Sequence, residues 1–385
     1  MNFNITEEQI MIRDMSREFV EKEIIPRGKE LDEKGEFPYD IAEKMANLGM
    51  MGIPYPEKYG GSGGDWLSLH ICIEEMSRGD VTLGVLLDVT TSVVAQMLYA
   101  FGTEEQKQKW LVPMAQGMEI GAFGLTEPNA GSDAGSTETR AVLDGNEWVI
   151  NGSKMFITNA GLKNMSIIIA TAATDKRKDS RRSINSFIIP KGTPGLIIGK
   201  KLDKLGWRAS NTHEIFFDNC LVPKENLLGK LEHGLSYHLA VLQTGRISVG
   251  AISLGLARAC FDASMRYAKT RVQFGKPIST YQRVQDKLAN MAMGIRLSQL
   301  IVYEAAWRKD NGLDYTKEAA YAKLYASEHA KYCADQAIQI HGGYGFMNEY
   351  DVSRYWREVK INEIGEGTYE IQRMVIARAL GCESF

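Results

Sequence analysis

The spacing of apolar residues changes twice along this chain of 385 residues. From Thr6 to about Gln116, apolar side chains recur at roughly helical intervals, as at Ile10 and Met15. A strongly apolar stretch over residues 82–99 predicts one long helix in this region. The first part of the chain is therefore expected to be helical.

Short β-type runs follow between about residues 119 and 228. Runs such as 148–150 and 213–217 are rich in β-branched and aromatic side chains, and Asp-Gly-Asn at 144–146 is a turn signal between two of them. This pattern predicts a small antiparallel β domain. The basic tract 175–182 is expected to be a solvated loop.

Helical spacing returns after about Glu232. Three long, alanine-rich segments, 237–267, 280–309 and 316–339, are typical of a helix bundle. We therefore predict an α+β multidomain fold. Its expected parts are an N-terminal α-helical domain over 1–118, a middle antiparallel β domain over 119–230 and a C-terminal four-helix bundle over 231–385.

Composition excludes several classes of protein. The net charge of −3 gives no field that would attract nucleic acid. Five cysteines without a C-x-x-C pair indicate reduced thiols and no zinc site. We expect no apolar run to reach transmembrane length, and the first residues resemble neither a signal nor a transit peptide. We expect a cytoplasmic enzyme without a metal or membrane insertion.

The stretch 361–373, Ile-Asn-Glu-Ile-Gly-Glu-Gly-Thr-Tyr-Glu-Ile-Gln-Arg, is a candidate site. Glu366 lies between two glycines, where a turn can bring a carboxylate close to a ligand. Thr368 is a natural N-cap for a helix over 369–380. On spacing alone, Glu366 is equally well explained as a capping or solvated glutamate.

This segment resembles the active-site segment of the acyl-CoA dehydrogenase family, and the resemblance extends from about Thr6 to Gly381. It implies an FAD-dependent enzyme that oxidises the Cα–Cβ bond of an acyl-CoA thioester. Glu366 is then the base for the α-proton, and the β-hydrogen leaves as hydride to flavin N5. The implied assembly is a homotetramer of paired dimers, and the implied electron acceptor is an electron-transfer flavoprotein.

Two segments of the β region resemble the family's flavin contacts. The stretch 123–133 offers backbone amides and hydroxyls that suit a heterocycle or a pyrophosphate, although composition alone favours a plain turn. Phe156 stands where many relatives carry tryptophan, and a phenylalanine can still stack on a ring. The contacts implied here are Phe123, Leu125, Thr126, Gly131, Ser132, Phe156 and Thr158.

Two segments of the helical C-terminal region resemble contacts to the FAD of a neighbouring subunit. Arg271 begins an R-x-x-F-G motif, and arginine can bind a pyrophosphate with two hydrogen bonds. A glycine cluster after a helix, at 342–345, is more often a C-cap, although both roles can coexist. The contacts implied are Arg271, Gln273, Phe274, Gln339, Gly342, Gly343, Thr368 and Glu370.

The resemblance also implies contacts to the acyl-CoA. Some relatives place the base directly before an arginine on another helix, but here Gly245 precedes Arg246, so no carboxylate competes with Glu366. Gln243 stands where an aspartate is common. The substrate contacts implied are Ser132, Gln243, Arg246, Gly365, Gly367 and Arg378.

Two departures from the family concern the acyl group. Gly365 replaces a common tyrosine, and Asp88 lies in the apolar run that lines the family's acyl pocket. Asp88 could instead face solvent or pair with a lysine. If it faces the pocket, it is a second catalytic candidate, and a short branched or alicyclic acyl-CoA is expected.

Other activities stay open from the sequence. The same site can reduce an enoyl-CoA, or perform a 1,4-type dehydrogenation of a cyclic acyl-CoA with Asp88. An acyl-CoA oxidase and a non-catalytic flavoprotein are further alternatives. A di-iron site would need Glu-x-x-His pairs on two helices, which Glu328-His329 and His341 do not provide.

Overall fold

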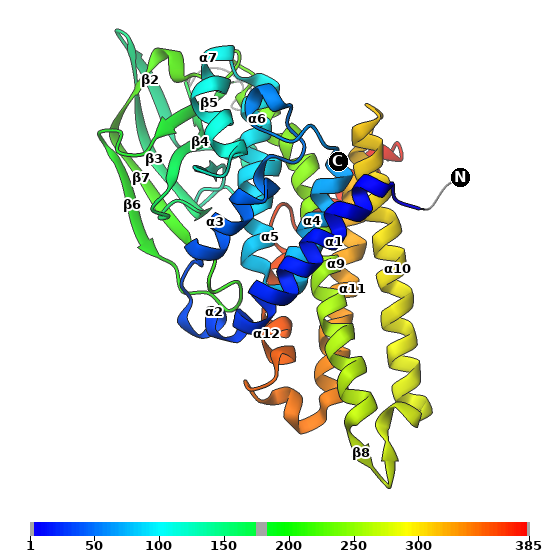
Figure 1. Ribbon diagram of the computed structural model, residues 1–385. Helices are drawn as coiled ribbons and strands as arrows, with labels where there is room; N and C mark the ends of the chain where they lie inside the picture. The colour runs from blue at the N-terminus through cyan, green and yellow to red at the C-terminus, as the bar shows by residue number, and fades with distance from the viewer. Residues whose placement is uncertain (1–3, 175–182, 383–385) are drawn as a thin grey trace.

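The computed structural model describes residues 4–174 and 183–382. The basic tract 175–182 lies outside the described residues. A helical layer and a β-sheet occupy one end of the molecule, and long helices extend from it to a narrow tip at β8 (Figure 1). The order of helical, β and helical regions agrees with the prediction.

The N-terminal helices begin at a cap that the sequence marks. Thr6 Oγ1 accepts the N–H of Gln9 at 3.2 Å, and Gln9 Oε1 accepts the N–H of Thr6 at 2.9 Å, which satisfies two donors at the helix start. The helices of this domain are α1 (Glu7–Phe19), α2 (Gly28–Lys34), α3 (Tyr39–Asn47), α4 (Trp66–Gly79), α5 (Val81–Leu87), α6 (Gln96–Phe101), α7 (Glu104–Gln106) and α8 (Val112–Ala115).

The predicted helix over 82–99 is continuous but changes its winding. Between α5 and α6 the segment Asp88–Ala95 is π-helical (η5), with hydrogen bonds to the fifth residue back. Asp80 caps the start by accepting the N–H of Thr82 at 2.8 Å. The π segment begins at Asp88, one of the two carboxylates singled out by sequence.

Seven strands form the described part of the β domain, and the expectation of a purely antiparallel sheet is corrected. Their order is β1-β4-β2-β3-β7-β6, with β5 paired to β4. β1 and β2 both run parallel to β4. Each is separated from β4 in the chain by at least one strand, β2 and β3 in the first case and β3 in the second, which permits a crossover. The strands are β1 (Ile120–Gly124), β2 (Arg140–Asp144), β3 (Glu147–Thr158), β4 (Met165–Ala173), β5 (Ile184–Pro190), β6 (Leu196–Lys201) and β7 (Thr212–Pro223).

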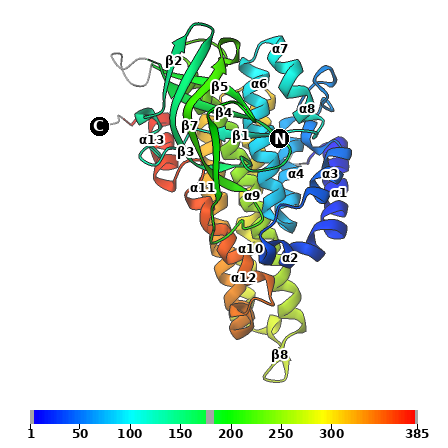
Figure 2. The same cartoon turned by 90° about the vertical axis from the view of Figure 1, so that its left-hand side faces the viewer.

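The described part of the C-terminal region contains three long α-helices and two shorter ones. Small buried alanines, such as Ala322 and Ala326, let α11 approach α9 closely (Figure 2). α4 of the N-terminal domain packs against α9 and α10. The elements are α9 (Gly234–Thr270), β8 (Val272–Gln273), β9 (Lys276–Pro277), α10 (Gln282–Asp310), α11 (Thr316–His341), α12 (Asp351–Glu358) and α13 (Tyr369–Ala379).

Two helical stretches are longer and more apolar than expected. Val81–Phe101 and Gly234–Thr270 have the length and hydropathy of a membrane-spanning helix, so the expectation that no run reaches this length was wrong. In the most apolar part of each stretch, 94% and 78% respectively is buried inside the protein. Packing of α9 against α4, α10 and α11, and of η5 against β1, explains this composition.

Candidate active site

Glu366 lies in a turn between the short helix Val359–Glu363 (η11) and α13. Its φ of 52° is unusual for a residue other than glycine, and such backbone strain is concentrated at functional sites. Thr368 caps α13 by accepting the N–H of Ile371, as predicted. Gln372 holds the turn by donating to the carbonyls of Glu366 and Gly367, at 3.2 and 2.9 Å.

The carboxyl group of Glu366 is buried although the residue as a whole is half-buried. Oε2 has no hydrogen-bond partner among the described residues. Burial raises the pKa of Glu366 to about 7, against the opposing effects of the neighbouring Asp88 carboxyl and the charges of Arg246 and Lys323. A glutamate with this pKa can exchange a proton near neutral pH.

Asp88 is the second carboxyl of the site. The residue is only 3% exposed, and Oδ1 of its carboxyl has no hydrogen-bond partner among the described residues. Burial, followed by the charge of Glu366, raises the pKa of Asp88 well above its usual range. Asp88 therefore faces Glu366 rather than solvent or a lysine. The charge of one carboxylate therefore disfavours ionisation of the other.

Arg246 and Gly245 form the adjacent wall on α9. Arg246 is 8% exposed and its Nε has no hydrogen-bond partner among the described residues. Burial lowers its pKa, partly offset by the charge of Glu366. Gly245 has no side chain to separate α9 from the Glu366 carboxylate. Space for a side chain is available at Gly365, because a β-carbon there would make only ordinary contacts, the nearest at 3.5 Å.

Lys323 was missed in the sequence. It is fully buried on α11, its Nζ donates to the carbonyl of Gly367 at 2.8 Å, and its charge acts on Glu366. Burial lowers its pKa to about 8. The sequence carries a signal for it, because Ala319, Ala326 and Ala330 share its face at helical spacing and are all buried.

A buried ion pair joins the two flavin-like segments of the β domain. Lys154 Nζ lies 2.6 Å from Glu127 Oε1, and it also donates to Thr171 Oγ1 and the carbonyl of Leu125. Glu127 in turn accepts the N–H of Glu138 at 2.6 Å. The pair therefore fixes the loop after β1 against β3. Neither residue was singled out from the sequence.

Phe156 interrupts β3 at a bulge. It has a φ of 63° and its ring is held outward, 62% exposed, beside a backbone bond from Met155 N to Thr126 O of 2.8 Å. Leu125 is buried, Phe123, Thr126 and Thr158 are half-buried, and Gly131 and Ser132 are exposed on the neighbouring loop. These residues belong to β1, the loop after it and β3, and their contact with a flavin stays a prediction.

Thr368 and Glu370 lie at the start of α13, whereas the predicted cofactor residues of the two C-terminal segments lie at the narrow end of the bundle marked by β8 (Figure 2). A cavity of about 450 Å³ is lined there by Arg271, Gln273, Gly342 and Gly343 together with Tyr267 and Tyr344. Phe274 is 94% exposed at the hairpin tip, and Gln339 is exposed at the end of α11. One chain therefore does not bring its two groups of cofactor residues together.

The remaining predicted residues lie around α13 and α9. Gly367 is half-buried beside Glu366, and Gln243 is half-buried on α9, three residues before Arg246. Glu370 and Arg378 are exposed on α13.

A helical domain, a β domain and a helical bundle that enclose a buried glutamate define the class of protein. Family models match the acyl-CoA dehydrogenase N-terminal domain at residues 6–118, the middle domain at 122–220 and the C-terminal domain at 232–381. The chain belongs to the acyl-CoA dehydrogenase family and is an oxidoreductase.

Individual relatives match over nearly the whole chain. The probable acyl-CoA dehydrogenase YngJ of Bacillus subtilis is 52% identical over 380 residues, which cover 99% of this chain and 100% of that protein. Butyryl-CoA dehydrogenase from Megasphaera elsdenii has a TM-score of 0.96 and 42% identity, covering 99% of this chain and 100% of that one. A chain in a structure of the electron transferring flavoprotein of Acidaminococcus fermentans has a TM-score of 0.96 and 45% identity, covering 99% of both chains.

Proposed function

We propose that this protein is an FAD-dependent dehydrogenase that converts a short, branched or alicyclic acyl-CoA into the enoyl-CoA, with Glu366 as the base. The observation that carries the proposal is the buried Glu366 carboxylate, whose partners are Asp88, Arg246 and Lys323. Family membership supports the reaction class. The Megasphaera elsdenii relative is a butyryl-CoA dehydrogenase, which supports a short acyl chain.

The residues present fit FAD. The outward ring of Phe156, held at a strained φ, supplies an aromatic face beside the half-buried Thr126. A β-carbon built on Gly131 of the β domain, or on Gly343 at the bundle tip, would have no neighbouring atom within 4 Å, which leaves room for a ligand to approach the backbone. We assign the flavin half to the β domain, and the adenosine half to the Arg271 cavity of a neighbouring subunit. When bound, FAD would accept the β-hydrogen as hydride.

The protein's own residues perform the proton chemistry. Ionised Glu366 accepts the α-proton, the Cα–H electron pair becomes part of the new Cα–Cβ double bond, and the β-hydrogen departs with its own electron pair. Arg246 and Lys323 stabilise the carboxylate before the transfer, and the buried site excludes water from it. The proton transfer requires the α-carbon of the thioester to lie close to the Glu366 carboxylate. We assign this positioning to the coenzyme A contacts proposed at Arg246 and Gln243.

Asp88 and Gly365 support the proposed acyl group. The absence of a side chain at Gly365 widens the space beside the reacting carbons. A buried carboxyl next to the base is a poor neighbour for a linear apolar chain and a better one for a polar group or an acidic C–H. A compact branched or ring-shaped acyl group uses this width, whereas a long linear chain does not.

A second candidate reaction follows from the contact between the two carboxyls. Because the buried Asp88 lies near enough to Glu366 to be affected by its charge, one ring carbon can meet Glu366 while another meets Asp88. A 1,4-type dehydrogenation of a cyclic acyl-CoA would use Asp88 as the second acid–base group. Reduction of an enoyl-CoA would use the same residues in reverse.

The electron acceptor and the assembly belong to the same proposal. The Acidaminococcus fermentans structure is titled for an electron transferring flavoprotein, which supports such a protein as the acceptor rather than oxygen. Two separated groups of cofactor residues support a homotetramer of paired dimers. We propose a cytoplasmic location on the basis of the cysteine pattern.

Anaerobic reduction of the yellow holoprotein tests the function. Loss of flavin absorbance would be compared for four thioesters: butyryl-CoA, a branched short acyl-CoA, an alicyclic acyl-CoA and octanoyl-CoA. Mass spectrometry would identify the products. The alicyclic or branched thioester should bleach the flavin fastest, and Asp88→Asn should slow that reaction. Faster oxidation of octanoyl-CoA would contradict the proposed acyl group, and peroxide formation in air would indicate an oxidase.

A further inference from the structure

A buried lysine connects the two segments of the β domain that are assigned to the flavin. Lys154 on β3 has a fully buried side chain, and its Nζ lies 2.6 Å from Oε1 of Glu127. The same Nζ donates to Oγ1 of Thr171 at 2.8 Å and to the carbonyl of Leu125 at 3.4 Å. A lysine ammonium carries three hydrogens, so these three acceptors use all of them.

Glu127 extends this connection into the loop after β1. Its carboxylate accepts the N–H of Glu138 at 2.6 Å and the N–H of Thr139 at 3.2 Å. Its own backbone N–H and carbonyl are both hydrogen-bonded to the backbone of Ala130, at 3.1 and 3.2 Å. The shape of the loop after β1 therefore depends on Glu127, and the position of Glu127 depends on Lys154.

Lys154 is also the last residue of β3 in regular register with β7 before the bulge. It lies opposite Ile215, and the register shifts before the next pair, Ile157 with His213. Phe156 lies inside this bulge, with its φ of 63° and its exposed ring. The side chain that holds the loop after β1 is therefore attached to β3 where Phe156 turns outward.

Stability alone is a weak reason for this buried ion pair. Taking both charges out of water costs free energy, and exchanging a buried pair for apolar side chains often leaves stability unchanged or raises it. Burial lowers the pKa of Lys154 to about 8, against the charge of Glu127, so the ammonium is still protonated at neutral pH. The pair adds direction, because its hydrogen bonds form only when the loop and β3 keep one relative position.

We infer that Lys154, with its partner Glu127, is a positioning residue that holds the loop after β1 and the bulge of β3 in one arrangement, in which both can contact the same flavin ring. The inference rests on the proposed binding of FAD, and the pair itself need not touch the cofactor. Without the ammonium, the Leu125 carbonyl loses its donor and the Glu127 carboxylate is left buried without a cation. The loop would then move until water reaches that carboxylate.

Release of FAD from the holoprotein tests this role without any substrate. Recovery of flavin fluorescence after dilution measures the rate of release. Lys154→Met should release FAD at least about tenfold faster than the wild type, the effect expected for one lost hydrogen bond to a charged group. The visible absorption band of the flavin that stays bound should also move towards that of free FAD, because the protein groups around the ring have moved.

A neutral pair separates positioning from stability. Lys154→Met alone leaves a buried carboxylate without its cation, so the urea unfolding midpoint at saturating FAD should fall as well. Adding Glu127→Gln removes that charge, and the amide oxygen still accepts a backbone N–H, so the midpoint should return towards the wild-type value. FAD release should stay fast, because methionine donates no hydrogen bond to the loop. The double variant also provides the measurement if Lys154→Met does not fold.

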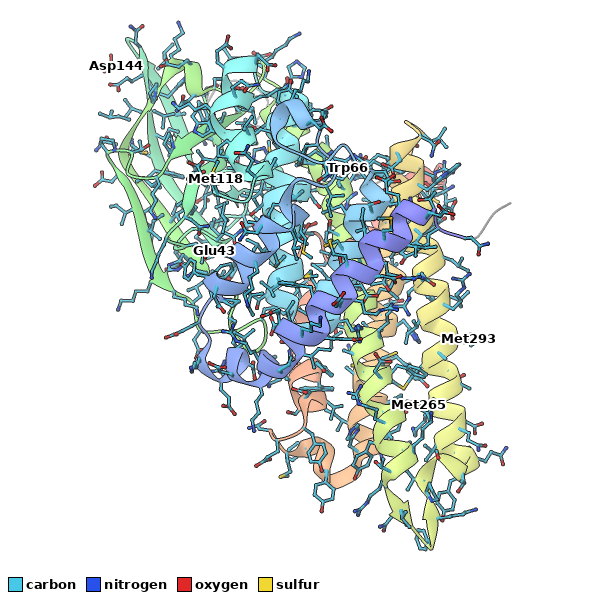
Figure 3. The ribbon with its side chains drawn as sticks, viewed as in Figure 1. Glu43, Trp66, Met118, Asp144, Met265 and Met293 are labelled. Carbon is cyan, nitrogen blue, oxygen red and sulfur yellow. The ribbon has the colours of Figure 1, made fainter. Side chains whose placement is uncertain are left out.

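Two control variants report effects unrelated to the flavin segments. Glu74→Gln breaks a buried ion pair with Arg258 between α4 and α9, so it should lower the unfolding midpoint without moving the flavin absorption band. Asp144→Asn changes an exposed carboxylate at the outer tip of the β2–β3 hairpin, labelled in Figure 3, and should change neither quantity.

Wild-type FAD release in Lys154→Met would overturn the inference. A double variant in which FAD release and the unfolding midpoint both return to the wild-type values would also overturn it, since the pair would then act only on stability. A wild-type protein that takes up no FAD would instead contradict the proposed function, so the two failures are distinguishable.

Discussion

A β-carbon built on Gly245 would lie 2.0 Å from Oε2 of Glu366. The helix α9 and the turn before α13 therefore meet at a point where only a hydrogen atom fits between backbone and carboxylate. Gly245→Ala should displace the carboxylate, which is the end of a flexible side chain, while the fold is retained. We expect a decrease in the rate of flavin reduction with an unchanged melting temperature. Gly365→Ala, where space is available, is the control and should leave that rate nearly unchanged.

Glu366→Gln should retain FAD and the fold but lose flavin reduction. The amide has nearly the same volume and cannot accept the α-proton, so the rate should fall by at least the ~10²–10⁴-fold typical of a general base. Stopped-flow bleaching of the flavin measures this. Glu105→Gln, at an exposed position on α7, should behave as wild type. Near-normal bleaching of Glu366→Gln would place the base elsewhere.

The pH dependence of activity should follow Glu366. Burial raises the pKa of Glu366 to about 7, and the ionised form is the base, so kcat/KM should rise with pH through about 7. Stability should change in the opposite direction. Between the ordinary glutamate pKa of 4.5 and about 7, the unfolded chain loses this proton first, so the free energy of unfolding should fall as pH rises. Glu366→Gln should remove that part of the pH dependence in denaturant titrations.

Sequence predicted those features that depend on local pattern. The order of helical and β regions and the cap at Thr368 follow from periodicity and side-chain chemistry, and the position of Glu366 follows from its motif. The carboxyl pair could be predicted only in part. Asp88 and Glu366 are far apart in the chain, and their contact depends on how η5 and the turn before α13 meet across α9. The parallel pairing of β1 with β4 is equally non-local.

The burial of Lys323 shows a different limit. Its alanine neighbours indicate the buried face of α11, but a lysine on such a face is normally excluded by the cost of burying its charge. The carbonyl of Gly367 and the charge of Glu366 offset that cost, and neither contact follows from helical spacing. The tertiary structure was needed to recognise it as part of the site.

Gly365→Tyr should narrow the substrate range. The position has no steric conflict for a β-carbon, so the new ring can be directed into the proposed acyl space without breaking the turn. We expect the KM of an alicyclic or branched acyl-CoA to rise and its kcat to fall, with butyryl-CoA affected less. Steady-state assays with both thioesters measure the ratio. An equal effect on both substrates would indicate that Gly365 does not border the acyl group.

Arg271→Ala should release FAD and weaken the assembly. Arg271 lines the cavity at the tip of the bundle and its guanidinium lies 5.3 Å from the centroid of the Tyr344 ring, which is an arrangement suited to a phosphate and an aromatic base. Flavin content after gel filtration and mass by light scattering measure the two effects. Arg283→Ala, an exposed position on α10, is the control. An intact oligomer with full flavin content would contradict a role across subunits.

Because the π-helical segment begins at Asp88, evolution could remove the Asp88 carboxyl from the site without changing Glu366. A π turn contains one residue more than an α turn, so deleting one codon within 88–95 would restore an ordinary helix between Val81 and Phe101. Each residue of α-helix turns the chain by about 100°, so Asp88 would rotate away from Glu366 while α6 kept its packing. A lineage could thus gain or lose a two-carboxyl site through a single-residue insertion or deletion, with Glu366 and Arg246 unchanged.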